Sequence, residues 1–554
     1  MLDYGSDFFN KSKKVAEDFL QTVVIVDDRA DFGPDWQEAK VKKLETPQQM
    51  HSLKSDQGND ESAESGQKHE LTENKKDVAH SFNAKHVIDN FAEKGIVCSV
   101  IRPDEADKKT LIDTISKLAT VADIIILDWS LHQDHGEKVK EILKRIAVFE
   151  PAIPEQLRLI VIYTGNPDIV NISKELKVYL EKISSEKFSI IEDNFTLYTP
   201  TLRVTIFIKP EISVPEEHKN RIVPFKGLAG KVTEEFTAMT AGLVSNVVLG
   251  SLYHIRKNTH KILHNFSEDL DAPYLTHRAL LPEPQDAENH LTALVVGELQ
   301  DVLEEAQVGS LSDLNYIKSW LEVNADDGKK YKLQVSGQER EFTCKEISKL
   351  LEDSLENWTK LSPTQQKKGH RLQLTRMFKG KNEESEFYDE KFAFKTSIRT
   401  YYGRSSPKLT LGTIIKLKDE NEYLVCIQPR CDCIRIKDPN RPFPFLPFKI
   451  IKKQGKKFEL VIKGKNKYIR LIRINNPYAL KMVTFSHDGK NLIVAQEKGD
   501  KGKFYFQDTE KREYEWIGEL KSEHAFRVAN EFAANLSRIG LNESEWLRLW
   551  KDKG

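Results

Sequence analysis

Short runs of apolar residues, each long enough for one strand and too short for a helix, constrain the fold more than any other feature of this sequence. The runs are Val23–Val26, Ile96–Ile101, Ile124–Leu127, Leu157–Tyr163 and Val204–Ile208. Strands that are apolar on both sides are typical of parallel sheets whose two faces are covered. Helix-like spacing of apolar residues separates the runs, near 80–94 and near 107–119. This alternation predicts an α/β fold with a doubly wound, parallel, five-stranded sheet.

Two further features belong to this part of the chain. An amphipathic stretch at 6–20 predicts a helix ahead of the first strand. From about 32 to 78 the sequence is polar and low in complexity, as in Ser52–Glu61. Such a stretch cannot bury enough apolar surface to hold itself in one conformation, so we expect a disordered insertion there.

The pattern changes twice in the remainder of the chain. Helical spacing runs from about Gly227 to Asn324 and is clearest at Phe236–Ile255 and Leu291–Leu303. From Lys408 onward, turn residues separate short strand-like runs. These runs are Thr413–Lys416, Tyr423–Ile427, Phe458–Ile462, Tyr468–Ile474 and Asn491–Ala495. Two helical stretches, Glu523–Ile539 and Glu543–Leu549, close the sequence.

These changes predict four parts. We expect an α/β domain at 1–222, a helical domain at 223–360, a linker at 361–400, and a small β-rich domain with C-terminal helices at 401–554. A chain of 554 residues is too long for one hydrophobic core, which agrees with several domains.

Composition narrows the class of protein. No apolar run approaches the roughly 18 residues that a membrane span needs, and the first residues lack a secretory signal pattern. Five cysteines in so long a chain give no disulfide framework, which fits a cytoplasmic location. The net charge is −1, so overall charge gives no argument for a nucleic-acid partner.

Polar residues stand where the predicted strands end. Asp27 and Asp28 end the first strand, Asp128 the third, Thr164 the fourth and Lys209 the fifth. In an open parallel sheet, ligands bind beyond the carboxyl ends of the strands, so these side chains are candidates for one site. Each signal alone is ordinary for a strand end; their order and their common position carry the argument.

An acid pair, an acid, a hydroxyl and a lysine in this order resemble the receiver domain of response regulators, over residues 18–212. Gly136, eight residues after Asp128, matches the glycine that opens the next helix in receivers. Thr164-Gly165 and Lys209-Pro210 match two further receiver pairs, the second of which often has a cis bond. The resemblance implies a flavodoxin-like sheet and a protein that accepts phosphoryl groups rather than a metabolic enzyme, with hydrolysis of its own acyl phosphate as a side activity.

The same resemblance implies the roles of single residues. Asp128 is the expected phosphoacceptor, served by a partner histidine kinase. Asp27, Asp28, Asp128 and the main-chain carbonyl of Ser130 are the expected ligands of Mg²⁺, which prefers oxygen ligands. Thr164 and Lys209 are expected to bind phosphoryl oxygens, and Gly165 to leave a path for the incoming group. A downstream effector is the second expected partner.

This sequence departs from the usual receiver pattern in three places. The stretch from Thr164 to Lys209 is longer than usual. The separation between the acid pair and Asp128 is longer than usual, mostly because of the polar insertion. Receivers usually have an aromatic residue three positions before the lysine, where this chain has Ile206; Phe207 should point to the other face of the strand. The acceptor chemistry is unaffected, but the usual aromatic switch is absent from that position.

Three weaker signals favour structural interpretations. Cys426, Cys431 and Cys433 lack the further ligands that a zinc site needs. His254, His260 and His264 lie in a predicted helix and are expected to be surface residues rather than phosphotransfer histidines. A basic ribbon from Lys449 to Arg473 is expected to be a solvated set of lysines and arginines, with nucleic-acid binding the less favoured alternative.

The C-terminal third, around Gly412–Asp432 and Trp516–Phe532, is similar to the trailing region of receiver proteins from bacterial antiphage loci, including the defensive two-component systems called Detocs. This resemblance implies a role in antiviral defence. Other functions stay open. They are an interaction scaffold with a degenerate receiver, a nucleic-acid-binding regulator, and a phosphohydrolase, although the last should have an acid at the position of Ser130.

Overall fold

A computed structural model of the chain describes residues 4–32 and 82–536 with short gaps. The gaps are 105–107, 148–156, 184–187, 191–194, 211, 285, 326–329, 336–337, 359, 361, 363–370, 380–384, 401, 403–404, 418–419, 421, 435, 452–457, 465–466, 475, 488, 490 and 499–502. The predicted insertion, beyond Phe32, and the predicted helix Glu543–Leu549 lie outside the described residues. The chain forms two compact units, Met1–Asn324 and Ala325–Gly554.

A mostly parallel sheet lies at the centre of the first unit. Its order is β4 (Val97–Ile101), β1 (Thr22–Val26), β5 (Ile124–Leu127), β6 (Arg158–Thr164), β9 (Leu202–Ile208), β8 (Thr196–Tyr198) and β7 (Ser189–Ile190). The first five strands of this order are parallel, and they are the five that the apolar runs predict. The hairpin β7–β8 adds two antiparallel strands beside β9. Strand order reverses between β4 and β5, on either side of β1, so the sheet is doubly wound as expected.

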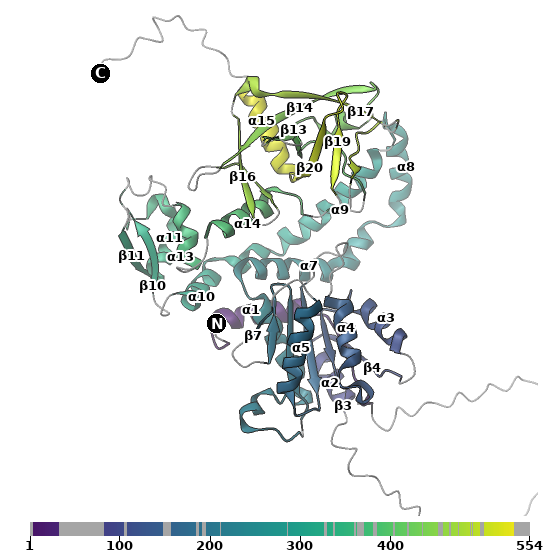
Figure 1. The fold of residues 1–554 in the computed structure, drawn as a ribbon, viewed down its shortest axis with the longest axis vertical. Coiled ribbons are helices and arrows are strands. Elements are labelled where there is room, and N and C mark those ends of the chain that lie inside the picture. The colour runs from purple at the N-terminus through teal and green to yellow at the C-terminus, as the bar shows by residue number, and fades with distance from the viewer. Residues whose placement is uncertain are drawn as a thin grey trace, which may run out of the picture. The chain divides into compact units, whose positions relative to one another are not determined.

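Helices cover both faces of this sheet (Figure 1). One face is packed by α3 (Lys108–Leu118), α4 (Glu137–Ala147) and α5 (Ile169–Ile183). The other is packed by α1 (Asp7–Phe19), α2 (Ala84–Ala92) and α6 (Leu228–Thr240). Alternate residues of the strands therefore enter two separate cores: Ile206 faces the first and Phe207 the second, as the strand period requires.

The rest of the first unit is helical. It contains α7 (Leu243–Asn265), α8 (Asp271–Leu280), α9 (Asp286–Glu305) and α10 (Leu314–Asn324). The single helix expected at Phe236–Ile255 is two helices, because the backbone is extended at Gly242 (φ 176°, ψ 149°). Helix α7 is tied to the sheet by Arg256, which donates to both carboxylate oxygens of Asp123 at 2.9 and 3.0 Å. Asp123 in turn accepts from the N–H groups of Gln21 and Thr22, at the start of β1.

The second unit begins with a hairpin and helices. The hairpin is β10 (Lys330–Val335) with β11 (Gln338–Thr343), followed by α11 (Cys344–Asn357). Helix α11 starts with a capping box, in which Thr343 and Glu346 satisfy each other's backbone N–H groups. Helices α13 (Arg371–Lys379) and α14 (Ser385–Ser397) follow in the segment 361–400, where we expected a linker.

A nine-stranded antiparallel sheet makes up the remainder. Its strands are β12 (Thr413–Leu417), β13 (Glu422–Cys426), β14 (Asn440–Ile450), β15 (Leu460–Lys463), β16 (Tyr468–Arg473), β17 (Lys481–Ser486), β18 (Gln496–Glu497), β19 (Phe504–Gln507) and β20 (Glu513–Glu519). The closing helix α15 (Ser522–Leu536) packs Ala525, Val528 and Phe532 onto one face. Gly412 permits this approach, because a Cβ there would lie 2.8 Å from the Cβ of Ala525. The prediction of an α/β part, a helical part and a β-rich part with a final helix is confirmed.

No described helix has both the length and the apolar character that crossing a membrane requires.

Candidate phosphoacceptor site

The register of the parallel strands gathers the predicted residues at one edge. Val26 pairs with Leu127, so Asp27 and Asp128, the next residues, leave the sheet side by side. Thr164 pairs with Ile208, so Lys209 lies one residue beyond Thr164 on the neighbouring strand. The sequence signals at separate strand ends are therefore neighbours in space.

Lys209 is the centre of the cluster. Its Nζ lies 2.6 Å from Oδ2 of Asp27 and 2.6 Å from Oδ2 of Asp128, and its side chain is almost fully buried. Burial alone lowers the pKa of Lys209, but the charges of Asp128 and Asp27 outweigh burial and leave that pKa raised. The ammonium therefore stays charged and bridges two carboxylates that would otherwise repel each other.

The surroundings of Asp27 shift the pKa of its carboxyl group. Burial raises the pKa of Asp27 to about 6; Lys209 acts to lower it and the charge of Asp128 to raise it. Its Oδ1 also accepts the N–H of Arg29 at 2.9 Å, which favours the ionised form. A second cation close to Asp27 would bring that pKa back down, so the site as built favours binding of one.

Asp28 supplies an oxygen with no partner. Its Oδ2 accepts the N–H of His132 at 2.9 Å, whereas its buried Oδ1 has no hydrogen-bond partner among the described residues. One carboxylate oxygen from each of Asp27, Asp28 and Asp128 lies within 4.8 Å of the others. Three carboxylates with oxygens so close together, together with an unpaired buried oxygen on Asp28, fit a divalent cation such as Mg²⁺.

Thr164 and Ser130 border the same edge. The Thr164 hydroxyl is buried and accepts the N–H of Asn166 at 3.1 Å, while its carbonyl accepts the N–H of Lys209 at 2.9 Å. Ser130 lies where the chain leaves β5 for a short 3-10 turn at Leu131–Gln133. The Lys209–Pro210 bond is trans, since none of the described peptide bonds is cis, in contrast to the bond that the receiver resemblance suggested.

The loop that follows Asp128 has an unusual backbone. His132, Gln133 and His135 all have φ between 52° and 59°, a left-handed conformation that is uncommon outside glycine. Gly136 follows with φ 86°, and a Cβ at this position would lie 2.4 Å from the Trp129 ring. The Asp134 carboxylate accepts the N–H groups of Gly136 and Lys138, at 3.1 and 2.7 Å, and so begins α4. This loop presents the His132 N–H to Asp28.

Sequence reasoning missed three contributors to the site. The Phe82 ring lies 5.7 Å from the Lys209 Nζ, a cation–π contact at the floor of the cluster. The backbone N–H of His132 has no sequence signal, because any residue type could supply it. Lys138 is buried with its Nζ 2.9 Å from Nδ1 of His132, and only its position two residues after Gly136 could have drawn attention to it.

The weaker signals lie outside this cluster. Cys426 and Cys433 are buried and Cys431 is exposed in the β-rich part, and the one candidate metal cluster among the described residues is the three aspartates. In the basic ribbon, Arg470 pairs with Glu386 and Glu390. Arg473, at the end of that ribbon, pairs with Glu459 and Glu531. Both arginines therefore already have acidic partners within the protein. The histidines singled out in the sequence lie on α7.

Comparison with known proteins gives one match. Residues 19–214, about a third of the chain, match the family described as the response receiver domain. No curated protein and no solved structure matches the chain. The matched residues include every strand of the seven-stranded sheet and every acidic, hydroxyl and lysine residue of the cluster.

Proposed function

We propose that the protein, whose residues 19–214 match the response receiver domain family, accepts a phosphoryl group on Asp128 in a Mg²⁺-dependent reaction. The donor is a phosphohistidine of a partner kinase. The observation that carries the proposal is the bridge that Lys209 makes to Asp27 and Asp128, at 2.6 Å each. It holds a positive charge beside the acceptor carboxylate, where the phosphoryl oxygens would arrive.

The transfer itself is a substitution at phosphorus. An oxygen of the Asp128 carboxylate attacks in line, an O–P bond forms, and the P–N bond to the donor histidine breaks. The histidine leaves with the electron pair of that bond, and Asp128 becomes an acyl phosphate. Lys209 then pairs with a phosphoryl oxygen in place of the carboxylate oxygen that it holds now.

The remaining residues position the phosphoryl group and the metal ion, and they help to neutralise the charge of the phosphoryl oxygens. Asp27 and Asp28, with Asp128 and the carbonyl of Ser130, would hold Mg²⁺, which supplies positive charge to the phosphoryl oxygens. Thr164 already accepts one hydrogen bond, and its own hydrogen would be donated to a phosphoryl oxygen. Gly165, which has no side chain, leaves the approach to Asp128 open.

The output of phosphorylation is either an altered contact with a downstream effector or storage of the phosphoryl group as a sink. Ile206, at the position where receivers usually have an aromatic residue, argues for a response that does not run through that position. A role in antiphage defence, in the cytoplasm, is the further part of the proposal and rests on the resemblance of the C-terminal third alone. We do not propose nucleic-acid binding.

Beryllium fluoride, which mimics a phosphoryl group on aspartate, tests the proposal. With Mg²⁺ it should raise the melting temperature of the wild-type protein, because it binds only the folded site. Asp128→Asn should abolish this rise, and Thr199→Ala, which changes a buried hydroxyl away from the cluster, should retain it. A rise of equal size in the Asp128→Asn protein would remove Asp128 from the reaction.

A further inference from the structure

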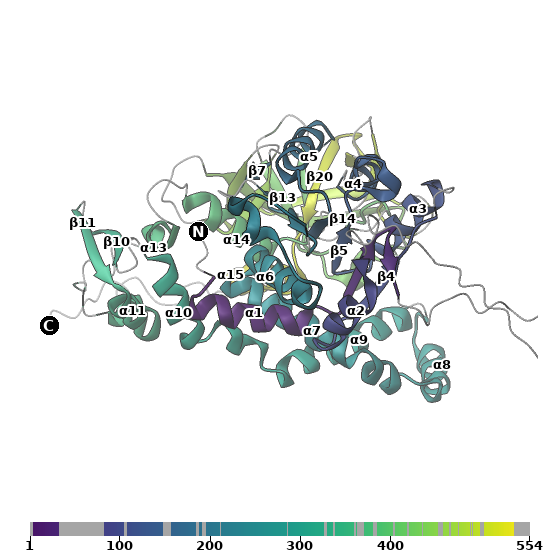
Figure 2. The same cartoon turned by 90° about the horizontal axis from the view of Figure 1, so that it is seen from below.

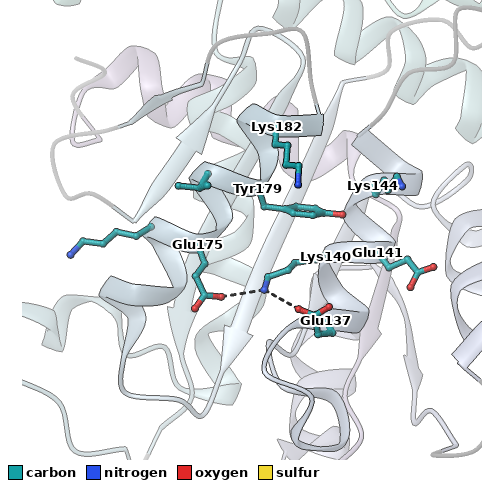
Figure 3. Close-up of a pocket in the computed structure, with 9 residues that line it drawn as sticks. Glu137, Lys140, Glu141, Lys144, Glu175, Tyr179 and Lys182 are labelled. Atoms are coloured by element: carbon teal, nitrogen blue, oxygen red, sulfur yellow. Dashed lines mark hydrogen bonds and ion pairs between the residues drawn. The ribbon is translucent and has the colours of Figure 1, made fainter.

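A groove runs between α4 and α5 on the face of the sheet opposite α1, α2 and α6 (Figure 3). Its volume is about 790 Å³, enough for several side chains rather than one ion. Residues of both helices line it, at helical spacing. Val178, on its rim, is 68% exposed, so the groove is open to solvent at this rim.

Lys140 closes the floor of the groove. Its Nζ lies 3.2 Å from Glu137 on its own helix and 3.3 Å from Glu175 on α5, and Figure 3 shows both bonds. The side chain of Lys140 is 19% exposed, so this three-residue link is partly sheltered. The charges of Lys140, Glu137 and Glu175 are thus used to join the two helices.

The charges that remain on the rim are mostly positive. Lys144, Lys174 and Lys182 are exposed, and none of them has an acidic partner within the part of the chain that the structure describes. Lys174 and Lys182 stand two helical turns apart, about 12 Å along α5, with Val178 between them. The rim therefore places three lysines, with Glu141 also among the lining residues, beside the apolar side chain of Val178.

Tyr179 adds a polar group between the lysines. Its ring extends from α5 toward α4 (Figure 3). Partial burial and the charge of Glu141 raise the pKa of Tyr179, so the hydroxyl stays protonated and can donate a hydrogen bond. A small molecule would be poorly enclosed in so open a groove, whereas a segment of polypeptide could lie along it.

We propose that the groove between α4 and α5 docks an acidic segment of a partner protein. Carboxylates of that segment pair with Lys144, Lys174 and Lys182, an apolar side chain covers Val178, and Tyr179 donates to the segment. Charge complementarity selects the occupant, because long-range attraction between opposite charges raises the rate of encounter and disfavours basic partners.

The groove is also connected to the acid cluster. The Nζ of Lys140 lies 5.7 Å from the centre of the Trp129 ring, and Trp129 directly follows Asp128. The ring is buried against Gly136, at the start of α4. A shift of Trp129 when Asp128 changes its charge would therefore displace Lys140 and the link between α4 and α5. This step rests on the proposed function, whereas the docking itself does not.

Binding of a synthetic peptide to the full chain tests the docking. The probe is a fluorescently labelled amphipathic helix of Glu, Leu and Ala, and its binding is measured by fluorescence anisotropy. The control peptide has Gln in place of Glu. The Glu peptide should bind saturably, and high salt should weaken it. Lys144→Glu with Lys182→Glu should weaken binding by about tenfold or more. Lys117→Glu with Lys177→Glu, the same change of charge outside the groove, should leave it within about twofold.

Three results would overturn the docking: no binding of the Glu peptide to wild type, equal binding of the Gln peptide, or equal loss in both double variants. Beryllium fluoride with Mg²⁺ then tests the link to Asp128, and should change the affinity for the peptide about threefold or more. Unchanged affinity, with beryllium fluoride bound by the criterion of melting temperature, contradicts the link alone. Absence of beryllium fluoride binding contradicts the proposed function and leaves the peptide result standing.

Discussion

At the scale of single residues, the site depends on charges buried close together. Asp27 is 1% exposed and Asp128 is 6% exposed, and Lys209 is shared between them. A buried ion pair stabilises only when every charge has its partner, and here two carboxylates compete for one lysine while Asp28 has a free oxygen. This shortage of positive charge is the physical reason to expect a cation.

The pKa of Asp27 gives the first prediction. Its folded value of about 6 lies above the ordinary 3.8, so the folded state binds this proton more tightly than the unfolded state. Without metal, the contribution of Asp27 to stability should therefore fall by about 2–3 kcal/mol as pH rises from about 4 to about 6. Asp27→Asn should flatten this part of the curve, measured by urea unfolding across that range. A curve of unchanged slope in the variant would contradict the assignment.

Binding of Mg²⁺ should follow the opposite trend, because the metal needs the ionised carboxylate. Its affinity should fall by up to about tenfold for each pH unit below 6, and titration calorimetry can measure it. Asp27→Asn, in which no proton competes, should bind weakly at every pH. An affinity for Mg²⁺ that does not change with pH in the wild-type protein would show that Asp27 is not a ligand.

Gly136 gives a prediction with an internal control. In Gly136→Ala the new Cβ meets the Trp129 ring at 2.4 Å, in a backbone conformation with φ 86°. The substitution should cost about 2–4 kcal/mol of unfolding free energy. Gly95→Ala has a similar φ of 72° but an open surrounding, so it should cost only about 1 kcal/mol. Equal losses would mean that packing against Trp129 does not matter.

At the scale of elements, the parallel strands were predictable and several others were not. Runs such as Ile124–Leu127 are apolar on both sides, so their pattern has one interpretation. The longest strand, β14, contains Pro442, Pro444 and Pro447, and proline normally argues against a strand. Tertiary pairing with β13, β16 and β17 overrides that preference. The strands β7 and β8 are too short to leave a periodic signal.

The candidate site, too, contains some residues that could be predicted from the sequence and others that could not. Asp27, Asp28, Asp128, Thr164 and Lys209 were predictable, because side chains at the ends of parallel strands share one edge. The contributions of His132 and Phe82 were not. The first is a backbone N–H placed by a left-handed loop, and the second comes after a long insertion whose length hides the spacing.

The attachment of α7 to the sheet gives a prediction at this scale. Asp123 accepts two bonds from Arg256 and three from the backbone and hydroxyl at the start of β1. Asp123→Ala should destabilise the first unit by about 3 kcal/mol, because it leaves these donors unpaired. Arg256→Ala should cost less, since its side chain is 29% exposed. A double-mutant cycle should give a coupling free energy of about 1–2 kcal/mol between Asp123 and Arg256. Zero coupling would contradict a stabilising interaction between these two residues.

At the scale of the whole molecule, the acid cluster belongs to a unit that extends beyond the receiver residues. The core on the face of the sheet that α1, α2 and α6 cover includes Leu228, Val232 and Phe236 of α6. These residues lie past the boundary at 222 that the sequence suggested. Burying three large apolar side chains contributes about 5–8 kcal/mol, a large share of the stability of a domain.

This core predicts how fragments behave. Residues 1–324 should unfold cooperatively and should show the same rise in melting temperature with Mg²⁺ that we expect of the full chain. Residues 1–222, which lack α6, should unfold at much lower temperature or fail to fold. Circular dichroism on the two fragments measures both outcomes. A fragment 1–222 as stable as 1–324 would show that α6 is dispensable to the receiver.

Intact mass after incubation with acetyl phosphate tests the central claim most directly. The wild-type protein with Mg²⁺ should gain the mass of one phosphoryl group, and Lys209→Ala should gain it more slowly because the positive charge at the acceptor is lost. Asp128→Asn removes the nucleophile and should gain nothing, while its circular dichroism matches the wild type. Phosphorylation of Asp128→Asn at the wild-type rate would contradict the account, as would a wild-type protein that stays unmodified by acetyl phosphate and by a phosphorylated histidine kinase.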